Sequence, residues 1–262
     1  MREYPNVRLK ESIVKKTSSK KKLNLISSTN NFWVSKNMMK KWQSYADHSE
    51  IDVNIYSNKQ VNTFMKKNFE DDLIFEIYMK SFLPVQKIDI FRLCSIFLYG
   101  GIWLDLKSEI NLEIVINEYQ DQNFKGLLLC EPRKIEVITT KKNKPHKTFQ
   151  HVIHNGFFLL PKKSQFIGAI LKNIKKDYLY FQDVVLKNPK EGIMNLTGPH
   201  QFTRTFYNLK KEERPKLISH KNIGWVYCSK HGEFISPFKT IRHYSSLKEL
   251  KIIDTFRPSN LV

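Results

Sequence analysis

Hydrophobic residues recur along the chain with two different periods, and each period predicts one kind of element. Short, largely apolar runs predict buried strands at residues 23–26, 102–104 and 127–130, and an alternating pattern predicts another strand at residues 53–56. Apolar residues three and four positions apart predict helices at residues 36–45, 61–68, 73–82 and 88–97. This order of strand, helix, strand, helices and strand predicts an α/β fold, with a mostly parallel central sheet flanked by helices.

The pattern changes abruptly in the middle of the chain. A helical pattern begins after Pro84, where the first turn of a helix tolerates proline. Gly100 and Gly101 can leave that helix with positive φ angles. The apolar run at residues 102–104 then ends at Asp105. Because open α/β sheets bind ligands at the carboxyl ends of their strands, Asp105 is the first candidate for a functional residue.

The second half of the chain also carries strand and helix patterns. An apolar run at residues 157–160 predicts another strand, and a helix is expected from about residue 164 to residue 176 or beyond. A further helix is expected at residues 200–207, because the Gly-Pro pair directly before it suits a first helical turn.

Length and charge limit the number of domains and the kind of partner. The 262 residues contain no evident linker, so we expect a basic N-terminal segment at residues 1–22 and a single domain at residues 23–262. Lysine and arginine number 44 against 25 aspartate and glutamate residues, which gives a net charge of +19. This surplus predicts attraction to nucleic acid, to anionic lipid or to a phosphorylated substrate.

The cysteines and the apolar runs bear on the compartment. Cys94, Cys130 and Cys228 are odd in number and widely spaced, which argues against a disulfide framework and a structural zinc site. The N-terminus lacks the apolar core of a signal peptide, and no apolar stretch approaches the roughly 18 residues that span a membrane. We therefore expect a cytoplasmic protein that can associate peripherally with a membrane.

Residues 89–107 resemble the sugar-binding region of glycosyltransferases that carry an Asp-x-Asp motif. The family pattern is Asp-x-x-Arg, a hydrophobic stretch, and Gly-Gly-(Ile/Val)-Tyr-x-Asp-x-Asp. The chain has Asp89 and Arg92, then the two glycines and Asp105, with Lys107 in place of the second aspartate. The group includes initiating α-mannosyltransferases, capsular polysaccharide transferases and, more distantly, the glucosylating clostridial toxins. The resemblance implies a GT-A type fold, a nucleotide-sugar donor, a role in polysaccharide biosynthesis, and retention of anomeric configuration.

Three later blocks are also similar to this family. Asn155 precedes an apolar strand, Thr197-Gly198-Pro199 opens a helix, and His243 stands near the end. The resemblance implies that Asp105 is catalytic and that the donor contacts comprise Asp89, Arg92, Gly100, Gly101, Asp105, Lys107, Asn155, Thr197 and Gly198.

A nucleotide-sugar transferase must neutralise a diphosphate leaving group, which Mn²⁺ or Mg²⁺ held by carboxylates can do. In extended backbone, residues 105, 107 and 109 project to one side. The Lys107 ammonium cannot ligate a cation, so Glu109, or His243 by its family position, would have to complete a site with Asp105. Alternatively, Lys107 pairs with the diphosphate directly and metal dependence is weak or absent.

Two other pairs of residues have more than one interpretation. Asp89 and Arg92 share a helical face, and an exposed ion pair between them would contribute only about 0–1 kcal/mol. The resemblance instead makes them donor contacts, for which a guanidinium and a carboxylate are suited. His151 and His154 are three positions apart, but no third ligand nearby supports a metal site.

Three functions are compatible with these features. The leading hypothesis is a glycosyltransferase that uses a UDP- or GDP-linked sugar and a glycan or phosphate-bearing acceptor. A basic nucleic-acid-binding protein would explain the charge, but the lysines are spread along the chain without a recognised module, so no specific nucleic acid is expected. A degenerate transferase, which binds a sugar nucleotide without turnover, would explain Lys107.

Overall fold

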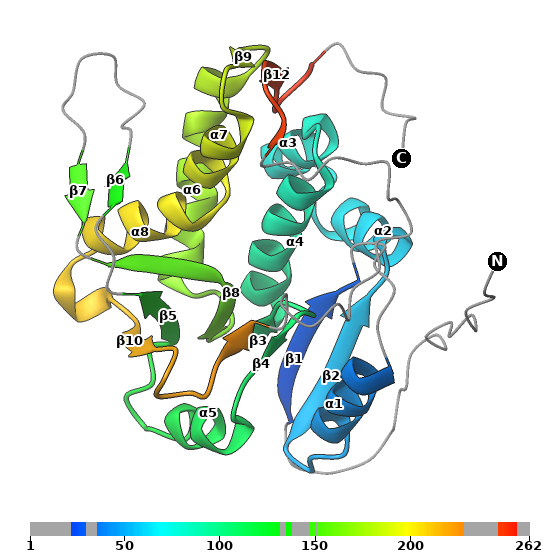
Figure 1. Ribbon diagram of the computed structural model, residues 1–262, viewed down its shortest axis with the longest axis vertical. Helices are drawn as coiled ribbons and strands as arrows, with labels where there is room; N and C mark the ends of the chain where they lie inside the picture. Colours follow the sequence, from blue (N-terminus) through cyan, green and yellow to red (C-terminus); the bar gives the residue numbers. More distant parts are fainter. Residues whose placement is uncertain are drawn as a thin grey trace.

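The computed structural model confirms the α/β class, with a central sheet flanked by helices (Figure 1). It describes residues 22–29, 36–131, 135–137, 147–149, 151–227 and 246–255. Residues 1–21 of the basic segment and the candidate ligand His243 lie outside the described residues.

Six strands form the central sheet. Their order is β10 (Lys216–Ser219), β5 (Leu127–Glu131), β8 (Val152–Leu160), β3 (Gly101–Leu104), β1 (Leu23–Ser28) and β2 (Ile51–Tyr56). Five of the six run in the same direction, and β8 runs against its neighbours β3 and β5. The mostly parallel sheet is therefore confirmed. Because β8 is reversed, its beginning lies at the same end of the sheet as the carboxyl ends of β3 and β5.

Helices cover both faces of this sheet (Figure 1). One face carries α2 (Asn58–Phe69), α3 (Leu73–Lys80), α4 (Pro84–Tyr99), α6 (Gln165–Phe181), α7 (Pro189–Leu196) and α8 (Pro199–Asn208). The other carries α1 (Lys36–Ala46) and α5 (Leu112–Tyr119). Strand side chains alternate between the two cores, so that Trp103 faces α4 while Ile102 and Leu104 face the opposite layer. Each helix that the hydrophobic pattern predicted is present, and the short helices α5 and α7 were not expected.

Short elements complete the fold. The two-stranded pairs are β4 (Ser108–Glu109) with β11 (Val226–Tyr227), β9 (Val185–Leu186) with β12 (Leu250–Lys251), and β6 (Ile135–Val137) with β7 (Lys147–Phe149). A 3-10 turn, η1 (Lys211–Glu213), precedes β10. Within the described part of the chain, no helix combines the length and the hydrophobicity that crossing a membrane requires.

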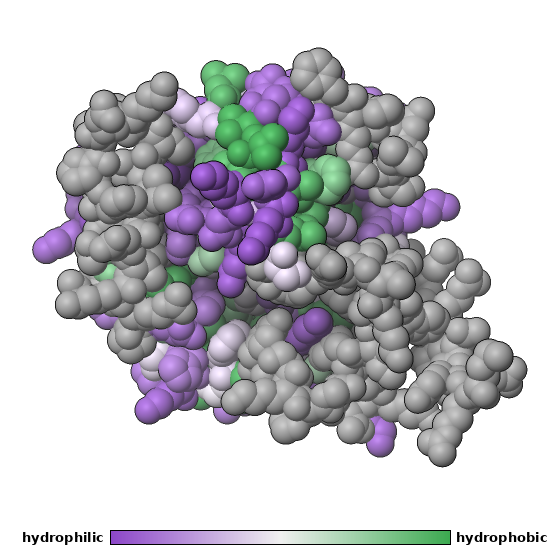
Figure 2. All heavy atoms as spheres, turned by 45° about the horizontal axis from the view of Figure 1, so that its top comes forward, coloured by the Kyte–Doolittle hydropathy of each residue, from purple (hydrophilic) through white to green (hydrophobic). Residues whose placement is uncertain are grey.

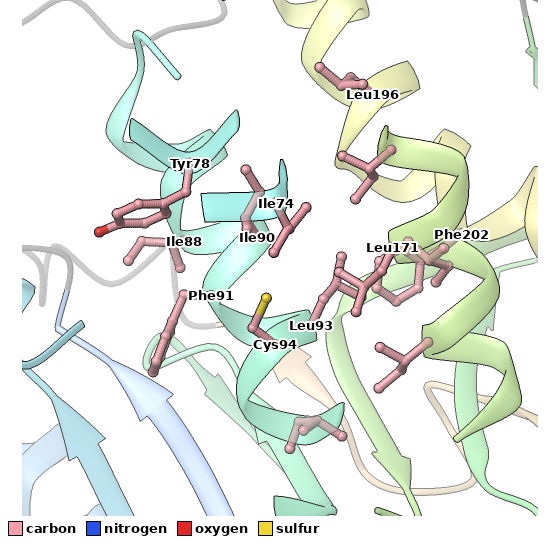
Figure 3. Packing of buried hydrophobic residues seen from close by; sticks show 14 of the residues in the cluster. Ile74, Tyr78, Ile88, Ile90, Phe91, Leu93, Cys94, Leu171, Leu196 and Phe202 are labelled. Carbon is pink, nitrogen blue, oxygen red and sulfur yellow. The ribbon is translucent and has the colours of Figure 1, made fainter. Parts of the chain in front are cut away.

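Helix α4 occupies the centre of the larger core (Figure 3). Its side chains are apolar on almost every side, as expected for a helix packed between a sheet and other helices. Figure 3 shows Ile90 and Leu93 of α4 among Ile74 of α3 and Leu171 of α6. A slanting row of buried polar residues interrupts this apolar surface at every third position: Gln86, Asp89, Arg92 and Ser95.

Two glycines connect α4 to β3. Gly100 and Gly101 have φ angles of 68° and 109°, which side-chain-bearing residues rarely adopt. A Cβ atom on Gly101 would lie 2.4 Å from the carbonyl oxygen of Asn24 in β1. The glycines therefore allow α4 to pass tightly into β3, at the end of β3 opposite to Asp105.

Strand β8 contains a bulge beside the carboxyl end of β3. Leu128 pairs with Phe158 and Cys130 with Ile153, so two steps along β5 correspond to five steps along β8. Residues 154–157 therefore face a single residue of β5. Bulges redirect side chains and are common next to functional sites. This bulge brings Asn155 to α4 and the Gly156 carbonyl to Asp105.

Candidate active site

Side chains from four segments of the chain meet at the carboxyl end of β3. Asp89 and Arg92 lie in the middle of α4, and Asp105 directly follows β3. Asn155 lies in the β8 bulge, and Thr197 lies at the end of α7. Asp89 and Thr197 touch although they are 108 positions apart. The fold thus brings together five of the residues that the sequence marked as donor contacts.

Arg92 lies between two carboxylates. One terminal nitrogen is 3.1 Å from Oδ1 of Asp89, and the other is 3.2 Å from Oδ1 of Asp105. The guanidinium carbon lies 5.0 Å from the centre of the Trp103 ring, and the guanidinium also donates to the carbonyl oxygen of Asn155. These contacts hold the charged group in one orientation.

The Asp89–Arg92 pair is buried, so the alternative interpretation as an exposed ion pair of low energy is wrong. The side chains of Asp89 and Arg92 are 4% and 6% exposed, whereas that of Asp105 is 32% exposed. Removing one partner of a buried pair typically costs about 3–5 kcal/mol, because the remaining charge has no compensation. Arg92 therefore supports the fold as well as the site.

Asp89 faces the interior of the protein. Its Oδ1 accepts a hydrogen bond from Nδ2 of Asn155 at 2.9 Å, and its Oδ2 accepts one from Oγ1 of Thr197 at 3.1 Å. Asn155, Thr197 and Arg92 thus all contact the Asp89 carboxylate, and the carboxylate orients these three side chains. Burial raises the pKa of Asp89 to about 7, against the opposing effects of the Arg92 charge and the Thr197 hydrogen bond.

Among the charged members of the cluster, Asp105 is the one that solvent reaches most, since its side chain is 32% exposed. Its Oδ1 accepts a hydrogen bond from the indole nitrogen of Trp103 at 2.9 Å, and its backbone nitrogen donates to the carbonyl of Gly156 at 2.8 Å. A Cβ atom at Gly156 would lie 3.0 Å from Oδ2 of Asp105, so glycine leaves space beside that oxygen. The cluster can therefore present one fixed carboxylate next to a positive charge.

The chain turns directly after Asp105, so the expected extended continuation is wrong. The Ser108 nitrogen donates to the carbonyl of Asp105 at 2.7 Å, which places Leu106 and Lys107 in a turn. Leu106 is buried, and its carbonyl accepts a hydrogen bond from Trp42 at 3.1 Å. Because Leu106 packs into the core, residues 105, 107 and 109 do not alternate as in a strand. Burial lowers the pKa of Lys107, and the Asp105 charge opposes this effect.

Glu109, the candidate metal ligand besides Asp105 that lies among the described residues, has a partner on α1. Glu109 pairs with Lys41 of α1 at 3.5 Å. No group of three histidine, cysteine, aspartate or glutamate side chains with the spacing of a metal site occurs among the residues that the structure describes. The described residues therefore do not fit a divalent cation held by protein carboxylates alone.

His151 and His154 have separate partners and do not share a site. Nδ1 of His151 lies 3.3 Å from the Tyr207 hydroxyl, whereas Nε2 of His154 lies 2.9 Å from Oε1 of Glu131. The two imidazoles therefore have different neighbours, Tyr207 of α8 and Glu131 of β5.

The remaining candidates are held by the backbone and by the core. Gly100 and Gly101 lie at the far end of β3, and the structure does not bring them to Asp105. Gly198 begins α8, and a Cβ atom there would lie 2.9 Å from Cα of Met194, so it permits the close turn after Thr197.

Sequence reasoning missed two features of this region. Trp103 stands two positions before Asp105 in a strand, and this spacing could have indicated that the two share a face. The ion pair of His154 with Glu131 had no such signal, because only the pairing of β5 with β8 brings these residues together.

The raised pKa of Asp89 makes stability depend on pH in a defined direction. Between about pH 4 and pH 7 the folded state holds a proton on Asp89 that the unfolded state has lost, so this group lowers stability as pH rises. We expect wild type to lose up to about 1.4 kcal/mol per pH unit relative to Asp89→Asn. Urea unfolding of both proteins at several pH values measures this difference. A wild type that instead gains stability relative to Asp89→Asn as pH rises would contradict this and mean that Arg92 keeps Asp89 ionised.

The chain is similar to two solved glycosyltransferase structures at low sequence identity. No protein-family model matches the chain, and a search of curated proteins found no match. Among solved structures, the chain is similar to the PaToxG glycosyltransferase, with 16% identity and a TM-score of 0.41, over 71% of this chain and 69% of that one. It is also similar to the UDP-bound glycosyltransferase domain from the YGT toxin, with 9% identity and a TM-score of 0.36, over 70% of this chain. The match spans 55% of that domain's length.

Proposed function

We propose that this chain is a glycosyltransferase of the GT-A type, which transfers a sugar from a nucleotide-sugar donor. The observation that carries the proposal is the contact of Asp105, Arg92 and Asp89 at the carboxyl end of β3. Ligands bind at this position in open α/β sheets. A donor carries hydroxyl groups and a diphosphate, and the cluster offers a partly exposed carboxylate beside a fixed guanidinium.

In this proposal, Asp105 is the catalytic residue and Arg92 supplies positive charge. Oδ2 of Asp105, beside Gly156, accepts a hydrogen bond from a sugar hydroxyl and so fixes the sugar. Negative charge builds on the diphosphate as the glycosidic bond breaks. A cation that is already oriented stabilises that state without reorganisation, and Asp89 keeps Arg92 oriented. Asp89 is therefore a positioning residue.

Lys107 replaces the second carboxylate of the family motif, and it supports weak metal dependence. It lies in the turn after Asp105, where its ammonium can approach the diphosphate. Mn²⁺ or Mg²⁺ would bind chiefly through the oxygen atoms of the donor, since the described residues do not enclose a cation. The cation would then add positive charge at the leaving group.

The donor of this proposal is a UDP- or GDP-linked sugar, and the transfer retains the anomeric configuration. The net charge of +19 favours an anionic acceptor, such as a phosphate-bearing glycan. No specific nucleic acid is part of the proposal.

A second candidate function is a sugar-nucleotide-binding protein without turnover. Lys107 favours it, because this residue removes a carboxylate that related transferases use. Hydrolysis of the donor separates the two candidates, since only the enzyme breaks the bond between sugar and diphosphate.

Asp105→Asn should abolish turnover without unfolding the protein. The substitution keeps the size of the side chain but removes the charge, and the loss of one preorganised electrostatic contact costs about 10²–10³-fold in rate. Release of UDP or GDP from a panel of nucleotide sugars measures the effect.

Asp47→Asn is the matched control, because Asp47 is an exposed carboxylate that contacts Gln43 at the end of α1. It should leave the rate unchanged. A folded Asp105→Asn protein with near-native turnover would contradict the assignment of Asp105.

The apo protein should bind Mn²⁺ only weakly, with a Kd on the order of 1 mM or above. The Asp105 carboxylate attracts the cation, but the Lys107 ammonium repels it. Lys107→Asp should tighten binding at least about tenfold by adding a carboxylate in the turn. Calorimetric titration without nucleotide measures both. Tight binding by the wild type would point to ligands outside the described residues, such as His243.

A further inference from the structure

Exposed hydrophobic side chains gather at the end of α6. The described residues include eight large hydrophobic side chains that are well exposed, and four of them lie within residues 179–185. They are Leu179 at 71%, Tyr180 at 50%, Val184 at 42% and Val185 at 57% exposure. We call these four residues the apolar tip. Such a concentration indicates a contact surface, because isolated exposed hydrophobic residues are common but clusters are not.

The apolar tip is held on a rigid frame. Asp183 has a φ angle of 56°, and this turn separates the end of α6 from β9. The Asp183 nitrogen donates to the carbonyl of Ile253 at 3.0 Å, and β9 pairs with β12 in an antiparallel register. The tip therefore projects from ordered secondary structure, at the top of the view in Figure 1.

Lysines stand on both sides of the apolar tip. Lys172 and Lys176 precede it on α6, and Lys187 and Lys190 follow it, all four being exposed. On the helix, Lys172, Lys176 and Leu179 are four and three positions apart, so they share one face. We call these four residues the flanking lysines. Figure 2 turns this end toward the reader and shows hydrophobic residues among strongly hydrophilic ones.

The acidic residues of the same segment do not cancel this charge. Asp177 is buried and pairs with Arg204 of α8. Asp183 accepts hydrogen bonds from the backbone and the hydroxyl group of Thr255, and it lies 3.8 Å from Lys251. Glu191 and Glu249 also lie close to the apolar tip in the chain or across the β9–β12 pair. Lysines nevertheless outnumber acidic residues in residues 172–191 and 248–254, seven against five, so the surface around the apolar tip combines hydrophobic residues with a small positive excess.

We propose that the apolar tip and the flanking lysines dock this protein on a bilayer surface that contains anionic phospholipid. Exposed leucine, valine and tyrosine side chains enter the boundary between headgroups and acyl chains, while the lysines contact the lipid phosphates. The charge argues for lipid as the occupant, because an apolar face that contacts another copy of this chain would bring the lysines of the two copies together.

The docking surface does not depend on the proposed transferase activity, since none of its residues belongs to the active-site cluster. The two regions are nevertheless connected by α7. This helix begins at Pro189 beside the flanking lysines and ends one residue before Thr197. Eight residues of helix span about 12 Å, so a docked protein would hold its active site close to the membrane.

Cosedimentation of the full chain with lipid vesicles tests the proposal. The chain should bind vesicles of roughly three parts phosphatidylcholine to one part phosphatidylserine, and should not bind pure phosphatidylcholine. The double variant Leu179→Ser/Val185→Ser should weaken binding at least about tenfold. Lys176→Gln and Lys187→Gln should each weaken it roughly fivefold, and added salt should reduce the difference.

Tyr119→Ser and Lys40→Gln are the matched controls. Tyr119 is 41% exposed on α5, and Lys40 is exposed on α1, both on the opposite face of the sheet. Neither change should alter vesicle binding. An equal loss in the controls, or unchanged binding by the tip variants, would overturn the proposal and move the contact to another surface such as the lysine-rich residues 1–22.

Fluorescence of a dye attached to the apolar tip gives a second test, which does not depend on the loss of binding by a variant. Val184→Cys labelled with an environment-sensitive dye should shift to the blue on anionic vesicles, whereas labelled Tyr119→Cys should not. Absence of the shift at Val184 would overturn the proposal. So would a change of oligomeric state in Leu179→Ser/Val185→Ser, because the tip would then be a contact between two copies of the chain.

Discussion

The bridge of Arg92 between Asp89 and Asp105 is the constraint on which the rest of the site depends. Above about pH 7, where Asp89 is ionised, the almost fully buried guanidinium and carboxylate compensate each other, because each would otherwise lose its hydration without replacement. This requirement explains why Asn155 and Thr197 both donate to Asp89, and why the β8 bulge and the end of α7 reach α4. The same arrangement fixes the Asp105 carboxylate, because Arg92 and Trp103 both contact its Oδ1.

Much of this could be predicted from the sequence, because local patterns carry it. The helix after Pro84, the strand before Asp105 and the helix after Gly198 each follow from spacing and from proline or glycine chemistry. The five residues of the cluster were recognised through motifs. The motifs did not say that Asp89 faces inward while Asp105 faces solvent, because burial is decided by the packing of α4 against distant helices.

Non-local contacts explain what the sequence did not indicate. The reversal of β8 and its bulge depend on pairing with β3 and β5, which no hydrophobic period encodes. Leu106 looked like one residue of an extended segment, yet its burial against α1 turns the chain. In the sequence, the end of α6 looks like the continuation of an ordinary amphipathic helix. Only the structure shows that Leu179 and Val185 are exposed there.

The most direct test of the account is to follow the indole Nε1–H signal of Trp103 by NMR while ligands are added. This proton is donated to Asp105, so it reports on the centre of the proposed donor site. Trp103→Phe assigns the signal among the four tryptophans of the chain. The account predicts that a UDP- or GDP-linked sugar shifts it in a saturable way and that an oligonucleotide does not. A signal that responds to no nucleotide sugar, or that responds to the oligonucleotide alone, would contradict the assignment of this cluster as a donor site.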